Sequence, residues 1–117
     1  MILADTSVWI DHLRHGNPTL QAHLGNDRVV CHAFVVGELA LGTLGNRAEI
    51  LTDLNRLPHL PIASHEEVMA LVERRRLFGL GVGWVDVHLL AAALIGGVRL
   101  WALDARLARV ARRLRVA

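Results

Sequence analysis

Short apolar runs alternate along the chain with segments whose apolar residues recur every three or four positions. The apolar runs are typical of strands buried on both faces, and the recurring positions are typical of amphipathic helices. The pattern predicts strands at 2–5, 28–32 and 99–103. It predicts helices at 6–15, 18–25, 33–44, 47–57, 64–76, 86–95 and 105–114. A short strand within 58–62 and another in the last residues would extend the sheet.

Polar and special residues mark several of the predicted boundaries. Asn17 followed by Pro18 is a typical helix start, and Ser64 with Glu67 has the spacing of a capping box. Three glycines in 79–84 predict a loop before the next helix. Strands that alternate with helices indicate an α/β fold with a parallel sheet covered on both sides.

Four acidic residues lie within the apolar segments, and they change this purely structural picture. Asp5, Glu38, Asp86 and Asp104 are each flanked by residues such as Leu, Val and Ala. A carboxylate is rarely buried without a partner, because removing an unpaired charge from water costs several kcal/mol. Asp5 and Asp104 also fall at the carboxyl ends of predicted strands, at the edge where parallel sheets bind ligands.

A divalent cation is the partner that the composition favours for these acids. The chain has 13 basic residues, all arginine, and none of them lies inside the four apolar windows. Mg²⁺ and Mn²⁺ prefer oxygen ligands. The formal net charge of +2 does not by itself indicate a nucleic-acid-binding protein.

Each acid also has a simpler interpretation that stays open at the level of sequence. Asp5, Asp86 and Asp104 stand where helices begin, so each can be explained as a helix cap. Glu38 lies in the middle of a predicted helix, and capping does not explain it. It could instead reach solvent beside Gly37 and Gly42.

Length and composition indicate one globular domain spanning 1–117. The chain is 53% hydrophobic, enough for a single core. The longest uncharged apolar run ends at Arg99, well short of the roughly 20 residues that span a membrane. No signal peptide is evident, and Cys31 has no second cysteine to pair with, so we expect a cytoplasmic protein without a membrane helix.

Several other kinds of site are excluded or disfavoured. Without lysine, the chain cannot be a P-loop protein, a receiver domain or a haloacid-type phosphatase. The glycines of 79–83 do not match the dinucleotide-binding fingerprint. Cys31 lies in an apolar run and is expected to be a small core residue. The seven histidines lack zinc-ligand spacing and are expected at the surface, with His88, close to Asp86, the one of interest.

The four acids and their surroundings resemble the PIN-domain family, most closely its VapC-type toxin ribonucleases. The similar stretches are LADTSVWI at 3–10, VGELALG at 36–42, GWVDVHLLAA at 83–92 and LWALD at 100–104. Their order and spacing agree over essentially the whole chain. Ala102 departs from the pattern, since such proteins often carry Thr or Ser there, which affects a secondary hydroxyl contact.

The resemblance implies a PIN-like three-layer α/β/α sandwich with a short, mainly parallel central sheet. It implies a toxin of a type II toxin–antitoxin system that hydrolyses RNA with Mg²⁺ or Mn²⁺. Asp5 and Asp86 would be the principal metal ligands, with Glu38 and Asp104 completing the catalytic cluster, partly through water. Thr6 or Ser7 would orient water or phosphate. The implied partners are a cognate VapB-type antitoxin and a second copy in a homodimer.

Arginines are the candidate contacts to RNA phosphates. Two groups stand out: Arg106, Arg109 and Arg113 recur at helical spacing, and Arg74, Arg75 and Arg76 are consecutive. Arginines near helix C-termini also stabilise the helix dipole, which explains both groups equally well.

Two further functions remain open from the sequence. The same acids would serve a PIN-type nuclease that processes RNA or acts on structured DNA. A non-catalytic PIN-like domain would instead use them to bind a partner's arginine.

Overall fold

The polypeptide forms a short parallel sheet with helices on both of its faces. This is seen in a computed structural model that describes residues 1–117. The elements are β1 Ile2–Ala4, α1 Thr6–His15, α2 Pro18–Gly25, β2 Val29–Val30, α3 Ala33–Leu41, α4 Arg47–Arg56, α5 His65–Arg75, α6 Trp84–Gly96, β3 Arg99–Trp101 and α7 Ala105–Arg113. All seven predicted helices are present, with ends within three residues of the prediction.

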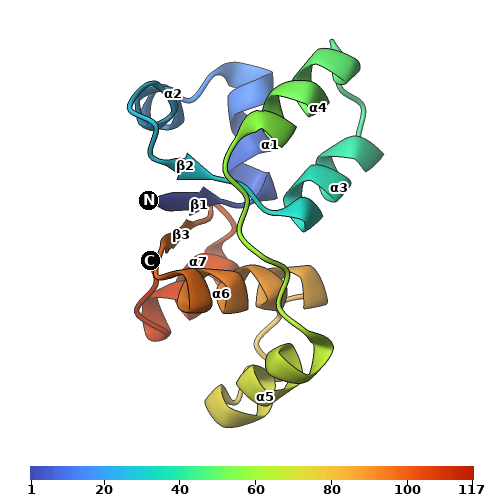
Figure 1. Cartoon of the computed structure of the whole chain (residues 1–117). Coiled ribbons are helices and arrows are strands. Elements are labelled where there is room, and N and C mark those ends of the chain that lie inside the picture. Colours follow the sequence, from blue (N-terminus) through green and yellow to red (C-terminus); the bar gives the residue numbers. More distant parts are fainter.

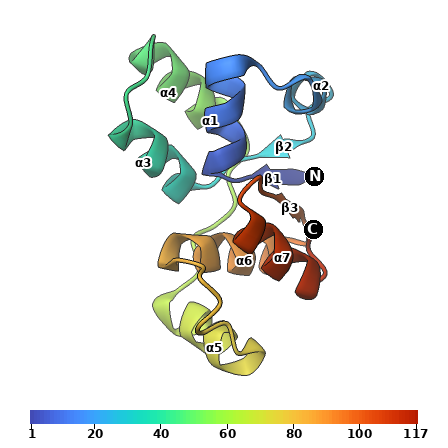
Figure 2. The ribbon, with the colours of Figure 1, turned by 180° about the vertical axis from the view of Figure 1, so that it is seen from behind.

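The sheet has the strand order β2-β1-β3, with both pairs parallel. Leu3 of the central strand lies opposite Val30 and Leu100, and all three side chains are buried. α7 lies behind α6 in Figure 1 and in front of it in Figure 2, and α1 and α4 change places in the same way. Helices therefore cover both faces, and the expected three-layer α/β/α arrangement is confirmed.

α5 stands apart from the other helices at one end of the molecule (Figure 1). It packs against α6. Its N-terminus has the predicted capping box, in which the Glu67 N–H donates to the Ser64 hydroxyl and the Ser64 N–H donates to the Glu67 carboxylate. α5 thus lies along one side of α6, from Trp84 near its start to Ile95 near its end.

The two additional strands expected at 58–62 and at the C-terminus do not form. At 58–62 there is only a single parallel bridge between Cys31 and His59. Near the C-terminus, the Leu100 N–H donates to the Val116 carbonyl (2.6 Å), but Arg115 has a left-handed backbone (φ 61°). That turn comes immediately before Val116, so this single hydrogen bond is the contact with β3 and no strand ladder forms.

The core behaves largely as its composition predicts. Cys31 is fully buried, as expected, and burial raises the pKa of its thiol to about 11, so the group is an inert core side chain. No helix combines the length and the apolar character that crossing a bilayer requires.

The expectation that all the histidines are at the surface is wrong for His32 and His88, which are both buried. His32 is the N-cap of α3, and its Nδ1 accepts from the Phe34 N–H (3.0 Å). Burial, with the charges of His88 and His59, lowers the pKa of His32 to about 4. The ring is therefore neutral at physiological pH and is part of the structure that positions α3.

Acidification should destabilise the protein through His32. Its pKa is about 4 in the folded state and near 6.5 when exposed, so the unfolded chain binds more protons between these values. We expect the stability contributed by the neutral ring to be complete above pH 6.5 and to be lost as the pH falls towards 4. The loss is on the order of 2 kcal/mol.

The measurement is chemical denaturation at a series of pH values, comparing the wild type with His32→Asn. Asparagine keeps a side-chain acceptor at the N-cap and does not titrate in this range. A pH dependence between 6.5 and 4 that is the same in both proteins would contradict the assignment to His32.

Candidate functional site

Asp5 is the most buried of the four acids, with 5% of its surface exposed. It follows β1 directly and is the N-cap of α1, where its Oδ1 accepts from the Val8 N–H (3.2 Å) and the Ser7 hydroxyl (2.5 Å). Burial raises the pKa of Asp5 above its ordinary value, and the charge of Asp86 raises it further, against the two hydrogen bonds. The two aspartates are therefore close enough to interact electrostatically.

Asp86 reaches the site from the first turn of α6. It is half-buried, and its Oδ2 accepts from the Gly83 N–H (3.0 Å). Asp86 is the third residue of the helix rather than its cap, which corrects the expectation that the helix begins at this residue. This hydrogen bond from the preceding Gly83 holds the Asp86 carboxylate at the N-terminal end of α6, where it interacts with Asp5.

Asp104 is the N-cap of α7, as the cap interpretation predicts. Its Oδ1 accepts from the N–H groups of Arg106 and Leu107, both at 3.0 Å. The residue is exposed, so the inference of burial from its apolar neighbours is wrong. Leu100 in β3 is buried, but Leu103 is 50% exposed, and Asp104 lies beyond the strand, at the turn into α7.

Glu38 is likewise exposed rather than buried. The solvent face of α3 is mostly apolar and includes Leu41, which is 90% exposed, so the hydrophobicity of the segment concealed this face. The Glu38 Oε1 accepts from the Thr6 hydroxyl (2.6 Å). This bond ties α3 to the start of α1, immediately beside Asp5.

Each of the three aspartates can cap a helix and also bind a ligand. One oxygen of each carboxylate accepts the helix-capping bonds, and the other oxygen accepts no hydrogen bond from the protein. Glu38 follows the same pattern, with only Oε1 engaged. Each of the four acids therefore combines a fixed orientation with one oxygen available to a ligand.

Ser7 connects two parts of this site. Its hydroxyl donates to Asp5 and accepts from the Leu103 N–H (3.0 Å), the residue before Asp104. The hydroxyls of Thr6 and Ser7 are thus both engaged with the protein, where the sequence led us to expect contacts with water or phosphate. Sequence reasoning missed this role, since nothing local indicates that residues 7 and 103 meet.

The four acids have no basic partner within the protein. The only ion pair in the chain joins Arg56 and Asp53, both well exposed. The acids do not form a compact cluster either, since no three Asp, Glu, His or Cys side chains are close enough together to hold a metal ion directly. Separated carboxylates with free oxygens suit a hard cation that keeps several water ligands, so the donor set fits Mg²⁺ or Mn²⁺.

One predicted arginine group runs along α7, the other lies at the C-terminal end of α5, and the two groups meet at one end of α7. All six of these arginines are exposed. Arg113, at the end of α7, donates to the carbonyl oxygen of Arg75 at the end of α5. At the other end of α7, a Cβ on Gly81 would lie 2.8 Å from the Arg106 side chain. The arginines therefore extend from the glycine loop beside Asp86 to the end of α5.

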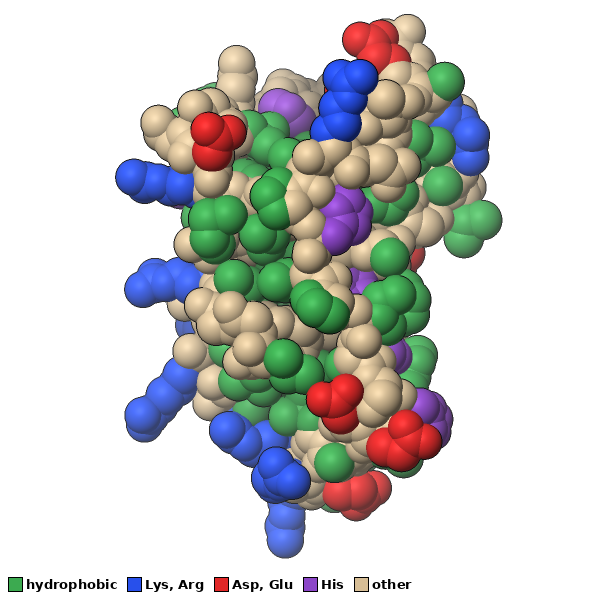
Figure 3. All heavy atoms as spheres, in the orientation of Figure 1, with side chains coloured by type: hydrophobic (Ala, Val, Ile, Leu, Met, Phe, Trp, Pro, Cys, Tyr) green, Lys and Arg blue, Asp and Glu red, His purple; other side chains and the backbone are tan.

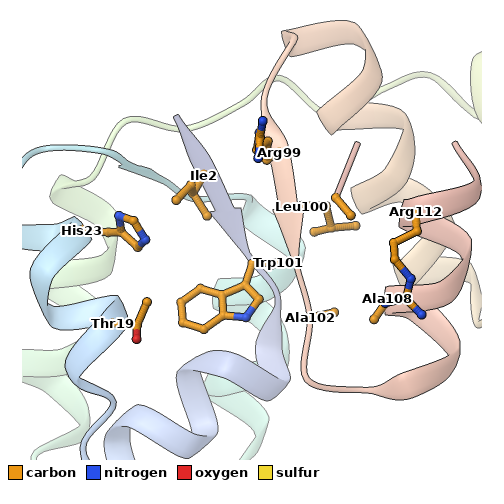
Figure 4. A pocket seen from close by; sticks show the side chains of 10 residues that line it. Ile2, Thr19, His23, Arg99, Leu100, Trp101, Ala102, Ala108 and Arg112 are labelled. Atoms are coloured by element: carbon orange, nitrogen blue, oxygen red, sulfur yellow. The ribbon is translucent and has the colours of Figure 1, made fainter. Parts of the chain in front are cut away.

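One further cavity is not lined by any of the four acids. It has a volume of about 330 Å³ and lies between α2, β3 and α7. Figure 4 shows the Trp101 indole pointing into it, towards His23 and Thr19. Its walls are mainly apolar, so the cavity is distinct from the carboxylate site.

Fold and site together define an α/β protein in which three aspartates lie at the starts of helices and Glu38 bonds to the residue that follows one of them. The chain belongs to the PIN domain family, whose sequence profile matches residues 2–113. It is similar to Ribonuclease VapC32 of Mycobacterium tuberculosis, with 51% identity over 108 residues in strain H37Rv and in strain CDC 1551. The alignment covers 92% of this chain and 87% of that protein. The resemblance to VapC-type proteins is confirmed.

Proposed function

We propose that this protein is the toxin of a type II toxin–antitoxin system and acts as a divalent-metal-dependent endoribonuclease. The observation that carries the proposal is the similarity of nearly the whole chain to a named ribonuclease, in a fold where all four acids keep a free oxygen. The acids of the similar stretches are thus available for chemistry as well as for helix capping.

Asp5 and Asp86 are proposed as the principal ligands of the metal, with Glu38 and Asp104 contributing through water. A bound Mg²⁺ or Mn²⁺ would polarise a phosphoryl oxygen and lower the pKa of a coordinated water. The protein supplies fixed carboxylates: Asp5 is oriented by Ser7 and Val8, and Asp86 by Gly83. Burial raises the pKa of Asp5 and so disfavours its ionised form, which a nearby cation would stabilise.

The arginines are proposed to bind the phosphates that flank the scissile bond. Arg106 is the best placed, because its side chain lies over Gly81, in the loop that leads to Asp86. Arg109 and Arg113 continue along α7, and Arg74, Arg75 and Arg76 follow at the end of α5. Arg113 is partly occupied with the Arg75 carbonyl, so it should contribute less to binding than Arg106.

The proposed partners are a VapB-type antitoxin and a second copy of the chain, in the cytoplasm. A cavity of about 410 Å³ between α1 and α3 has Glu38 and Arg14 among its lining, which suits a peptide with both polar and apolar groups. Exposed Leu41, Ile62 and Ile95 provide apolar surface that a homodimer would cover.

Parallel cleavage assays on RNA and DNA test the function. We expect internal cleavage of RNA with Mg²⁺ or Mn²⁺, no cleavage after chelation, and little action on structured DNA of matched length. Cleavage of the DNA instead would favour the alternative PIN nuclease. If neither substrate is cut in the presence of either ion, the chain is not a nuclease and the binding-domain alternative holds.

A further inference from the structure

We propose that four ring side chains beside the carboxylate site form a stacking surface for an unpaired base of the RNA substrate. These side chains, Phe34, His65, Trp84 and His88, are called the aromatic surface below. The inference rests on the proposed function and adds a subsite that holds a base rather than a phosphate.

The rings contact one another in sequence across three helices. Phe34 of α3 meets His88 of α6 edge-to-face, with ring centroids 4.7 Å apart. His88 meets Trp84 in the same way at 5.1 Å, one turn along α6. Trp84 then lies 5.4 Å from His65 at the start of α5, with the rings tilted by 43°. The indole is thus held from two sides by rings on different helices.

If these rings only packed in the core, they would not be as exposed as they are. His88 is buried, but Trp84 is 44% exposed, Phe34 is half-buried and His65 is exposed. The other two tryptophans differ, since Trp9 is 5% exposed and Trp101 points into the cavity between α2 and α7. A tryptophan that only joined α5 to α6 could lie flat between them. Trp84 instead keeps much of its surface in solvent while its orientation is fixed.

The aromatic surface adjoins two of the four acids. Phe34 precedes Glu38 by four residues on α3, so both lie on one side of that helix. Trp84 opens α6, and the Asp86 carboxylate is held back against the adjacent Gly83 N–H at the same helix end. Figure 3 shows histidine and hydrophobic side chains together along the right-hand edge of the molecule, between the ends of α3 and α5 placed in Figure 1.

Base stacking on uncharged rings would supply binding affinity at a place where the carboxylates repel the RNA phosphates. Four carboxylates repel RNA phosphates, so affinity close to the site must come partly from groups other than charge. The indole of Trp84 and the phenyl ring of Phe34 carry no charge at any pH, so a base can stack on them beside the carboxylates. Unpaired bases stack on aromatic side chains whatever their sequence, and single-stranded RNA is recognised in this way.

The test compares two forms of one labelled single-stranded RNA. Its length is about twelve nucleotides, within the range of site sizes of proteins that bind single strands. One form is complete, and the other has abasic residues in place of the bases but keeps every phosphate. Binding is measured by fluorescence anisotropy in an Asp5→Asn background, so that the RNA stays intact. Every variant shares this background, so any loss of metal binding affects all of them equally. We expect Trp84→Leu to weaken binding of the complete RNA roughly 10-fold, which corresponds to about 1.4 kcal/mol.

Three comparisons make this result specific. Trp84→Phe keeps a ring and should retain most of the affinity, and Trp101→Leu, which removes the tryptophan of the separate cavity, should change nothing. The abasic RNA should bind equally to the Trp84→Leu variant and to its parent. Thermal melting of each variant shows whether α5 remains docked.

Two outcomes overturn the proposal, and they are distinguishable. If the wild type cleaves RNA but Trp84→Leu binds complete RNA as tightly as its parent, the stacking site is wrong and the proposed function stands. If the wild type neither binds nor cleaves RNA, both fail. An unchanged affinity for RNA together with weakened binding of a partner protein would assign the aromatic surface to that partner instead.

Discussion

Replacing Asp5 by asparagine is expected to lower RNA cleavage by at least about 100-fold while leaving the protein folded. Residues that only support a metal ligand typically cost 10–100-fold when changed, so a proposed ligand should cost more. Asparagine is as good an N-cap as aspartate, and its oxygen can still accept from the Val8 N–H. Because the change also removes a buried charge, unfolding should require as much denaturant as before, or more.

The measurements are cleavage rates and thermal melting, each with and without Mg²⁺. The wild type should be stabilised by the ion, by about 2.7 kcal/mol at a free concentration 100 times its Kd, and Asp5→Asn should lose this effect. Asp11→Asn is the matched control, because Asp11 is a half-buried aspartate of α1 whose carboxylate accepts from the Asn17 side chain, away from the other acids. Equal cleavage by wild type and Asp5→Asn would refute the assigned site.

Much of the fold could be predicted because the signals are local. The Asn17-Pro18 start, the Ser64 capping box and the glycines before Trp84 each depend on a few neighbouring residues, and all of them appear where predicted. The extra strands failed because strand formation depends on distant partners. The apolar residues at 58–62 gained only one bridge, at His59.

The surroundings of the candidate site residues were predicted only in part. Apolar neighbours were a good guide to burial for Asp5, which follows a central strand, and a poor one for Glu38, which lies on the exposed side of an apolar helix. Hydrophobicity averaged along a segment does not reveal which face of a helix meets water. The stacked rings of Trp84 and His65 were also missed, because only the tertiary fold brings α5 beside α6.

Replacing Ser7 by alanine should be the next most damaging change at the site, although Ser7 is not proposed to touch the substrate. The Leu103 N–H would lose its acceptor and Asp5 would lose a donor, at a cost of about 1–3 kcal/mol in the free energy of unfolding. As a positioning residue, Ser7 should affect cleavage by about 10–100-fold. Thr6→Val is the control, because its hydroxyl bonds only to the exposed Glu38 and should matter less.

The pH profile of cleavage separates this positioning role from simple destabilisation. The Ser7 hydrogen bond lowers the pKa of Asp5, against the burial that raises it, so removing the hydroxyl should raise that pKa further. Asp5 must be ionised to bind a cation, and the acid limb of the profile should therefore move to higher pH in Ser7→Ala. Ser7→Thr keeps a hydroxyl and should restore the wild-type limb. If Ser7→Ala loses stability but the acid limb does not move, then Ser7 holds Leu103 against the start of α1 but does not affect the pKa of Asp5.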